Sequence, residues 1–331
     1  MLGAVLAFLS AGFFGLNNST VRRGVLKASV LQGMAITVPL GVPLFLVFAI
    51  AFGGLAALAD WPAATWAWMA LAGIVHFVLG RYGNYRATQA LGATLSTPVQ
   101  QISILVSLVL AVVFLGERVS LLNLVGIGLV MLGPVVVLRQ HKSSTAKARA
   151  KGFEPEYLPG FGWGAVCALG YGVSPLLIAL GLDAARASGG GHGLADSVAG
   201  VLVSYVAATI VVAGLVAAAG GRRYMAGMDR GAGVWFYLST LFVALSQLFR
   251  YLALAVAPVS VVVPIQRLSM VFRIVFNGLL NADHEVMDRW ILLTILVSLI
   301  GVLFLTLDGE AMLLWLGLPG GIAESLAGPI F

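Results

Sequence analysis

Apolar residues fill this chain from end to end, in stretches long enough to cross a lipid bilayer. A membrane-spanning helix needs about 20 mostly apolar residues, and ten such stretches follow one another with short polar connections. They lie at residues 2–21, 29–54, 65–88, 93–115, 121–138, 161–182, 197–219, 233–255, 258–280 and 290–307. The sequence therefore predicts an all-α integral membrane protein with ten transmembrane helices, and we expect it in a bacterial inner (plasma) membrane.

The composition excludes the soluble classes of protein. Hydrophobic residues make up 60% of the 331 residues and charged residues only 10%, whereas soluble proteins carry about 25% charged residues. Too few polar side chains remain to cover a water-facing surface, which excludes a soluble enzyme, a nucleic-acid-binding protein and a disordered chain. The single cysteine, Cys167, allows neither an internal disulfide nor a multi-cysteine metal site. We expect the bilayer and a small-molecule substrate as partners, no nucleic acid and no cofactor, and the oligomeric state stays open.

The lysines and arginines predict the orientation of the chain, because cytoplasmic loops of membrane proteins are enriched in them. The loops after the odd-numbered segments hold thirteen basic residues, whereas the loops after the even-numbered segments hold only Arg118 and Arg186. The thirteen are Arg22, Arg23, Lys27, Arg86, Arg139, Lys142, Lys147, Arg149, Lys151, Arg222, Arg223, Arg230 and Arg289. This bias places the odd-numbered loops in the cytoplasm and both chain termini outside.

The two halves of the chain resemble each other. The sequence YRATQALGATLS at residues 85–96 aligns with FRYLALAVAPVS at 249–260, and after a two-residue shift PVQQIS at 98–103 aligns with PIQRLS at 264–269. Each half contains five of the expected helices, and an odd number of helices forces the two copies into opposite orientations across the membrane. Inverted repeats of this kind are typical of secondary transporters, whose substrate site lies between the repeats near the middle of the bilayer.

The longest polar run separates these halves. Residues 139–160 are basic and contain serine, threonine and proline, which is typical of a cytoplasmic linker. The expected organisation is therefore a five-helix repeat at residues 1–138, the linker at 139–160, a second five-helix repeat at 161–308 and an apolar C-terminal tail at 309–331.

Three short motifs carry a family resemblance. ALGATLSTPV lies at residues 90–99, FLGERVS at 114–120 and GIGLVMLG at 126–133, and the second half echoes them with APVSVVVP at 257–264 and with Gly301. In this order the chain resembles EamA-type members of the drug/metabolite transporter superfamily over essentially its whole length. The resemblance implies two EamA-like repeats, a central cavity lined by the first, third, fourth, sixth, eighth and ninth helices, and secondary transport of a small solute that it does not identify.

Two features depart from the family's pattern. The second half has NADHE at residues 281–285 in place of the LGE triplet of the first half. Ten-helix members of the family usually keep both termini in the cytoplasm, whereas the charge bias of this chain predicts the reverse. We follow the charge bias for the expected orientation.

Arginines, but no carboxylates, fall well inside the expected membrane helices. The thirteen Asp and Glu residues lie in expected loops or at helix ends, while Arg267 and Arg273 lie inside the segment 258–280. A central arginine costs about 2.5–3.5 kcal/mol on insertion scales. Either these arginines attract an anion such as a carboxylate or a phosphate, which guanidinium groups bind well, or they bond to backbone carbonyls beside Pro264. In a third interpretation the segment is misplaced, and one arginine reaches the membrane surface.

Helical spacing selects the side chains that we expect to face a substrate pocket. At about 100° per residue, Gln266 and Arg273 share one face of their helix. The alternative for a serine in such a helix is a hydrogen bond to its own backbone. The candidate substrate-binding residues on the two repeat-equivalent segments are Gln100, Gln101, Ser103, Gln266, Arg267 and Arg273.

Further candidates lie on the other helices expected around the cavity. Arg86 and Arg250 are equivalent in the repeat, so both are expected at the cavity mouth unless they extend to the membrane surface. His76 either relays protons or is a packed histidine bonded to a carbonyl. The remaining candidates are Asn17, Asn18, Asn84 and Tyr171, of which the two neighbouring asparagines either bind substrate or cap a helix end.

Three classes of function remain. The leading hypothesis is a secondary transporter that moves a small metabolite, an organic anion if Arg273 faces the cavity, by alternating access. The second is an exporter of neutral or cationic drugs or amino acids, although the lack of a central carboxylate counts against a cation. The third is an intramembrane lipid-handling enzyme, but the chain has no GxSxG or HExxH motif and no paired central acids. We therefore expect a transporter and no enzymatic activity.

Overall fold

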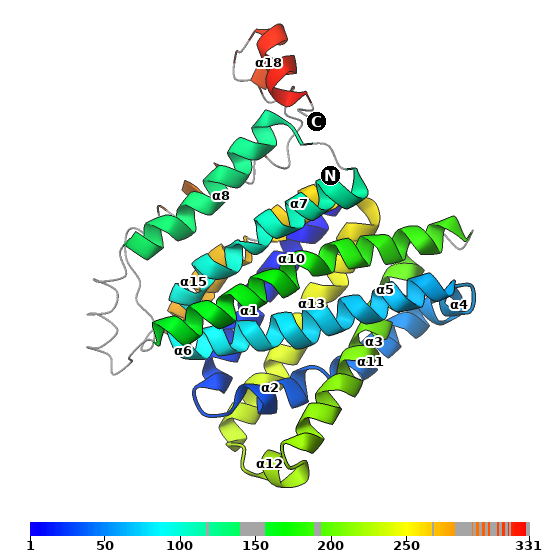
Figure 1. Cartoon of the computed structure of the whole chain (residues 1–331), viewed down its shortest axis with the longest axis vertical. Helices are drawn as coiled ribbons and strands as arrows, with labels where there is room; N and C mark the ends of the chain where they lie inside the picture. Colours follow the sequence, from blue (N-terminus) through cyan, green and yellow to red (C-terminus); the bar gives the residue numbers. More distant parts are fainter. Residues whose placement is uncertain are drawn as a thin grey trace.

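The computed structural model is built from α-helices that pack side by side (Figure 1). It describes residues 1–116, 119–139, 156–188, 193–266, 268–281, 293, 296–297, 300–301, 304, 310, 313–314, 317 and 319–328. Among these residues, six helices are long and apolar enough to cross a membrane, and two shorter apolar helices accompany them. An integral membrane protein made of helices agrees with the prediction from the sequence.

The first half of the chain begins with one long helix and continues through helices that break several times. Ser29 begins the second helix with a capping box, because its hydroxyl accepts a hydrogen bond from the amide of Gln32 while its own amide donates to the side chain of Gln32. The helices of this half are α1 (Leu2–Val25), α2 (Val30–Thr37), α3 (Gly41–Ala51), α4 (Gly54–Ala59), α5 (Ala63–Gly73), the π-helix η1 (Ile74–Gly80), α6 (Arg81–Gln101), α7 (Ser103–Leu115) and α8 (Leu121–Arg139).

The second half contains three helices that are longer than the sequence predicted, and one expected segment of it is broken. Asp229 caps the start of the last of these three helices by accepting a hydrogen bond from the amide of Ala232 at 2.8 Å. The helices of this half are α10 (Tyr157–Ala187), α11 (Leu194–Ala218), α12 (Arg222–Ala226), α13 (Arg230–Val256), α14 (Val259–Gln266) and α15 (Ser269–Leu280). Near the C-terminus, α18 (Gly320–Ala327) lies against α8.

Several expected segments differ from the helices that form. The segment 29–54 divides into α2, α3 and the start of α4, and 258–280 divides into α14 and α15. The segments 65–88 and 93–115 meet at Gly92: α5, η1 and the first part of α6 continue one another up to this residue, where the chain leaves helical geometry with φ at +80°. Glycine permits this backbone conformation at little cost. The segment 290–307 lies largely outside the described residues, so the count of ten helices stays a prediction.

Helices α1 and α10 each pack on the opposite half of the chain. α1 packs on α13 and α15, and α10 packs on α6 and α7. Glycines permit both contacts: a Cβ atom at Gly15 would lie 2.5 Å from the Cβ of Phe272, and one at Gly172 would lie 2.6 Å from the Cβ of Val106. Close helix contact through small residues is typical of membrane proteins. The two halves are thus interleaved around α1, α10 and α13, which lie in the middle of the bundle (Figure 1).

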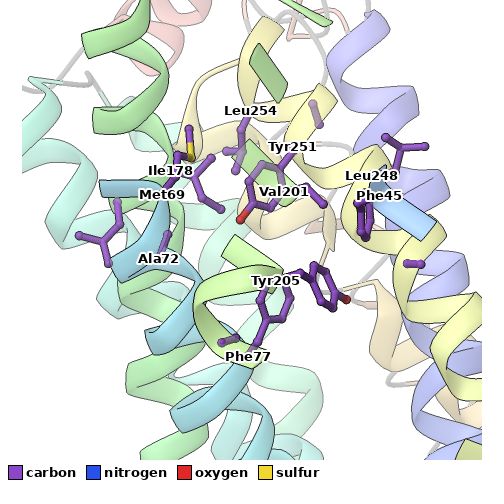
Figure 2. Close-up of a cluster of buried hydrophobic side chains, with 14 of the residues drawn as sticks. Phe45, Met69, Ala72, Phe77, Ile178, Val201, Tyr205, Leu248, Tyr251 and Leu254 are labelled. Carbon is purple, nitrogen blue, oxygen red and sulfur yellow. The ribbon is translucent and has the colours of Figure 1, made fainter. Parts of the chain in front are cut away.

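A core of large side chains fills the space between α3, α5, η1, α10, α11 and α13. Tyr205 is its centre, since its ring lies 4.1 Å from that of Phe77 and 5.1 Å from that of Phe45. Met69, Ile178 and the other labelled residues continue this cluster toward α13 in Figure 2. Aromatic contacts of this kind stabilise packing beyond the area that they bury. The core fixes η1 against α11, and η1 carries the first residue of the site described next.

Candidate functional site

The site begins with an irregular stretch of helix between α5 and α6. Residues Ile74–Gly80 form a π-helix, a conformation that is rare and frequently found at functional sites. His76 lies in this stretch and is 4% exposed. Its ring stacks on the ring of Tyr171 in α10, with 4.5 Å between the centroids. The π-helix thereby places an imidazole inside the bundle, against α10.

Arg250 of α13 meets His76 at this point. Its Nη1 lies 2.8 Å from Nδ1 and 3.0 Å from Nε2 of His76, and its Nη2 donates to the hydroxyl of Ser174 at 2.9 Å. That hydroxyl also lies 2.9 Å from Nδ1 of His76. Because a guanidinium group can only donate, the imidazole nitrogen that accepts from it is unprotonated. His76 is therefore neutral in this arrangement, and the three side chains together carry one positive charge.

A cavity of about 20 Å³ lies beside these side chains, at the meeting point of both halves of the chain. We call it the central cavity. It is lined by Ser10, Ala11, Phe14, His76, Tyr171, Ser246, Gln247, Arg250, Gln266 and Ser269. Eight of these ten residues carry a hydroxyl, amide, imidazole or guanidinium group, and none of the ten is acidic. A cavity of this size holds about one water molecule, so this conformation has no room for a metabolite.

Pro175 loosens α10 next to the cavity. A proline has no amide hydrogen, so the carbonyl of Tyr171, four residues earlier, loses its usual helical donor. Ser174 immediately precedes this proline and contacts both Arg250 and His76. The irregular backbone of α10 and the π-helix therefore face each other across the same polar contact.

A second buried arginine, Arg273 of α15, lies outside the lining of the central cavity. Its Nη2 donates to the hydroxyl of Thr88 at 2.8 Å and to that of Ser96 at 3.3 Å, and its Nη1 donates to Oε1 of Gln100 at 3.3 Å. We call these four residues the Arg273 cluster. Nε2 of Gln100 is buried and has no hydrogen-bond partner among the described residues. The cluster thus combines a guanidinium group with an amide donor that is available to a ligand.

Two aromatic side chains, Phe14 and Tyr171, lie between Arg250 and Arg273, and we call them the aromatic pair. Along α1, Ser10 lines the central cavity, and Ser19 donates to the backbone oxygen of Arg273 at 3.4 Å. Nine residues of α-helix separate these serines by about 14 Å. Phe14 lies between them and meets Tyr171 edge to face, with 5.8 Å between the ring centroids. The central cavity and the Arg273 cluster are therefore successive levels of the bundle.

The described interior is richer in positive than in negative side chains. Four arginines are at most 4% exposed, whereas Asp196 is the only acid among the described residues that is buried, with 3% exposure. Asp196 accepts a hydrogen bond from the indole of Trp61 at 2.8 Å, at the start of α11. The four arginines are Arg22, Arg81, Arg250 and Arg273. Such an interior favours a negatively charged ligand.

The structure distributes the sequence-predicted residues over three places. Tyr171, Arg250 and Gln266 line the central cavity, and Gln100 and Arg273 belong to the Arg273 cluster. Gln266 and Arg273 were predicted to face one pocket, but Gln266 donates to the hydroxyl of Ser10 at 3.0 Å beside the central cavity, whereas Arg273 belongs to the Arg273 cluster. The side chain of Gln101 and the whole of Arg267 lie outside the part of the chain that the structure describes.

Asn17, Asn18 and Asn84 form a polar contact inside the bundle. The amide of Asn84 donates to Oδ1 of Asn18 at 2.8 Å, and the hydroxyl of Ser239 donates to Oδ1 of Asn17 at 2.6 Å. The interpretation of the two neighbouring asparagines as a helix cap is wrong, because α1 continues to Val25. Along α1 the two asparagines lie between Phe14 of the aromatic pair and Ser19, which contacts the backbone of Arg273.

Three further expectations change. Ser103 donates to the backbone oxygen of Gln100 at 2.6 Å, which is the backbone alternative for a serine. Arg86 and Arg250 do not share a cavity mouth: Arg250 is buried in the central cavity, whereas Arg86 is half-buried elsewhere and donates to Gln89 at 2.7 Å. Arg22 is not a loop residue, because it lies in α1, is 1% exposed and donates to the carbonyl of Thr88.

Sequence reasoning missed part of the cavity lining. Ser10 and Ser246 are among the missed residues, and their hydroxyls donate to each other's backbone carbonyls at 2.8 and 2.9 Å. A serine in an apolar helix is a signal too weak to select it alone. His76 was considered from the sequence, but nothing in the sequence connects it with Gln247 and Arg250 in one contact.

Comparison with known proteins places part of the chain in a family. The model of the EamA-like transporter family matches residues 1–139. A search of curated proteins finds no match. Among solved structures, one crystal structure of a protein aligns with 93% of this chain and 98% of its own chain, with a TM-score of 0.67 and 17% sequence identity. At this identity the likeness shows a shared fold alone.

Proposed function

We propose that this chain, whose residues 1–139 belong to the EamA-like transporter family, is a secondary transporter that moves a small organic anion across the membrane by alternating access. The family match confirms the resemblance that the sequence motifs carried, and the family is one of transporters. Six described helices can span a bilayer by length and composition. The chain is thus a membrane protein of a transporter family, and its substrate class and mechanism are what we propose.

The lining of the central cavity carries the substrate proposal. Arg250 supplies a guanidinium group there, and His76, Gln247 and Gln266 supply imidazole and amide groups around it. A guanidinium group binds carboxylates and phosphates through charge-assisted hydrogen bonds, which are stronger in a dry interior than in water. An anion in this position replaces His76 as the acceptor for Arg250. We infer that the substrate carries a carboxylate or phosphate group.

The crossed packing of α1 and α10 supports two inverted repeats. Gly15 of α1 packs on Phe272, and Gly172 of α10 packs on Val106. Phe272 and Val106 are equivalent when the alignment of residues 264–269 with 98–103 is continued along both helices. The first helix of each half therefore meets the fourth helix of the other half at the same position. A two-fold relation between the halves in the plane of the membrane produces this pattern.

The interruptions of α6 and α13 also support two inverted repeats. α6 leaves helical geometry at Gly92, just before Ala93, and α13 ends at the extended residue Ala257, which aligns with Ala93. Interrupted helices at corresponding positions of two repeats are typical of the substrate sites of secondary transporters. Both interruptions lie in segments that carry site residues, Ser96 and Gln100 in one case and Gln266 in the other.

The aromatic pair is the barrier that alternating access requires. Phe14 and Tyr171 each precede the glycine that packs on the opposite half, so they occupy equivalent positions in α1 and α10. In our proposal the anion binds first beside Arg250 and moves to the Arg273 cluster when the halves tilt and these rings separate. Nε2 of Gln100 then donates to it. Arg273 and Gln100 are thus substrate-binding residues of the second conformation.

We orient the chain with α12 toward the cytoplasm. The exposed residues Lys27, Arg222, Arg223 and Arg230 gather at that end of the bundle, where α12 contacts the start of α2. Cytoplasmic enrichment in basic residues favours this orientation. The N-terminus lies at the opposite end in Figure 1, so we place both termini outside a bacterial inner membrane.

Solute uptake and exchange in proteoliposomes test the proposed function. The full chain and Arg273→Gln are compared with a panel of anionic, zwitterionic and cationic metabolites. We expect the wild type to move anions, and we expect the variant to move them about tenfold more slowly because the substrate loses a charge-assisted partner. Transport of neutral or cationic solutes at the same rate by both proteins would contradict the anion proposal and favour an exporter of such solutes.

A further inference from the structure

A second hollow lies away from the central cavity, between α2, η1, α6, α10 and the α11–α12 connection. Its volume is about 570 Å³, which is in the range of ligand pockets. We call it the lateral groove. The residues of its lining on which the inference depends are Leu79, Tyr82, Arg86, Gln89, Trp163 and Tyr224.

The lateral groove is polar at one end and apolar at the other. At the polar end the hydroxyls of Ser29 and Tyr224 bond to each other, and the amide of Gln89 donates to the backbone oxygen of Val25 at 3.2 Å. Val78 and Leu79 form the apolar end, farther along the same helical rod. Leu79 is 51% exposed, so the groove opens on the outer surface of the bundle, where lipid lies. A ligand that fits has a polar head and an apolar chain.

Arg86 gives the polar end its charge. Its side chain is half-buried, and Nη1 donates to Oε1 of Gln89 at 2.7 Å. This bond uses one of five N–H groups, so the planar guanidinium can still offer a pair of donors to a phosphate. The exposed residues Lys27, Arg222 and Arg223 lie at the same end of the bundle. The groove and its surroundings are thus complementary to a negatively charged headgroup.

Two aromatic rings mark the level of the headgroup. Tyr82 and Trp163 line the groove and meet edge to face, with 5.0 Å between their centroids. Tyrosine and tryptophan concentrate at the membrane surface because one side of each ring system is apolar and the other carries a donor. Arg86 follows Tyr82 by one helical turn, so the charged group lies next to this aromatic level.

We propose that the lateral groove is a binding site for an acidic phospholipid. The phosphate lies on Arg86, and one acyl chain follows Val78, Leu79 and Val166 toward the middle of the bilayer. An apolar wall open to lipid fits this ligand better than it fits a free metabolite, which would leave the wall uncovered. The repeat-equivalent arginines therefore have different ligands: Arg250 faces the transported anion, and Arg86 holds a lipid.

The bound lipid contacts the helices that form the site. α6 and α10 pack closely where a Cβ atom at Gly83 would lie 2.7 Å from the backbone nitrogen of Cys167 and 2.7 Å from the oxygen of Trp163. Lipid in the lateral groove covers this contact from outside, and α10 carries Tyr171 of the aromatic pair. Dependence of the transport rate on acidic lipid follows, and this consequence alone rests on the proposed function.

Quenching of tryptophan fluorescence by brominated lipids tests binding without any transport measurement. The full chain is reconstituted into phosphatidylcholine vesicles that contain dibrominated phosphatidylglycerol or dibrominated phosphatidylcholine. The chain has seven tryptophans, so the component of Trp163 is the difference between the wild type and Trp163→Phe. We expect the acidic lipid to quench this component at about a tenfold lower mole fraction than the neutral lipid.

Variants at Arg86 separate a specific site from general contact with lipid. Arg86→Gln should abolish the difference between the two lipids, Arg86→Lys should retain most of it, and Arg230→Gln, an exposed arginine at the same end, should leave it unchanged. Equal quenching by both lipids in the wild type, or a full difference in Arg86→Gln, would overturn the proposal. Relief of quenching by free glycerol phosphate would show a solute site instead. The lipid comparison in the wild type holds even if Arg86→Gln does not fold, and a protein that binds lipid but transports no anion would refute only the proposed function.

Discussion

Replacing Arg250 with glutamine is expected to lower anion uptake by about a hundredfold. The variant removes the guanidinium group from the described lining of the central cavity. It also removes Nη1, which lies 2.8 Å from Nδ1 of His76, and Nη2, which donates to the hydroxyl of Ser174 at 2.9 Å. Leaving buried acceptors without their charged donor costs free energy. Arg250→Lys keeps the charge but offers one ammonium group in place of a planar fork, so we expect it to recover only part of the rate.

The measurement is the initial rate of uptake in proteoliposomes, with thermal melting of each purified variant as the test of folding. Arg186→Gln is the matched control, because Arg186 is exposed and pairs with Asp183 at 2.7 Å, outside the cavity lining. A surface change of this kind alters stability by about 0.5 kcal/mol or less, and we expect normal uptake. A folded Arg250→Gln protein that transports at the wild-type rate would refute the placement of the anion.

Replacing Gly170 with alanine should destabilise the bundle by about 1–3 kcal/mol and strongly reduce transport. A Cβ atom at Gly170 would lie 2.7 Å from both the Cα and the nitrogen of Gly80, and 2.9 Å from the carbonyl oxygen of Val75. All three are backbone atoms of η1, so no side chain can turn away to make room. α10 must move off the π-helix, and this movement separates Ser174 from His76.

Gly162→Ala is the control for this prediction. Gly162 lies in the same helix, is exposed, and would have no atom within 4 Å of an added Cβ. Alanine is the better helix former by about 0.5–1 kcal/mol, so this variant should melt at the same or a higher temperature. Melting in detergent, followed by intrinsic fluorescence, compares the two variants. Equal melting temperatures would mean that α10 and η1 are not in the close contact on which the site depends.

The membrane class and the family could be predicted from the sequence, because both depend on local properties. Runs of about 20 apolar residues are visible without knowledge of any contact, and the short motifs around residues 90–133 suffice for the family. The breaks within the runs were less visible. The expected segment 258–280 reads as one apolar run, and only the structure divides it into α14 and α15.

The candidate site was predicted in part. Tyr171, Arg250 and Gln266 were selected because polar residues in apolar helices are expensive and therefore few. Their grouping was not predicted: helical spacing paired Gln266 with Arg273, but Gln266 lines the central cavity and Arg273 belongs to the Arg273 cluster. Arg86 and Arg250 are matched in sequence, yet one lies in the lateral groove and the other in the central cavity.

The sequence by itself therefore determined that this chain is helical, resides in a membrane and resembles one transporter family, because apolar content and short motifs can be read along the chain. Only the tertiary structure decided which polar groups meet. In a membrane protein the lipid-facing side of a helix is as apolar as the buried side, so hydrophobic periodicity does not indicate which face points inward. The contact of His76 in η1 with Arg250 in α13 joins residues 174 positions apart, and it depends on a π-helix and on the glycine contact at Gly170, neither of which a local pattern reveals.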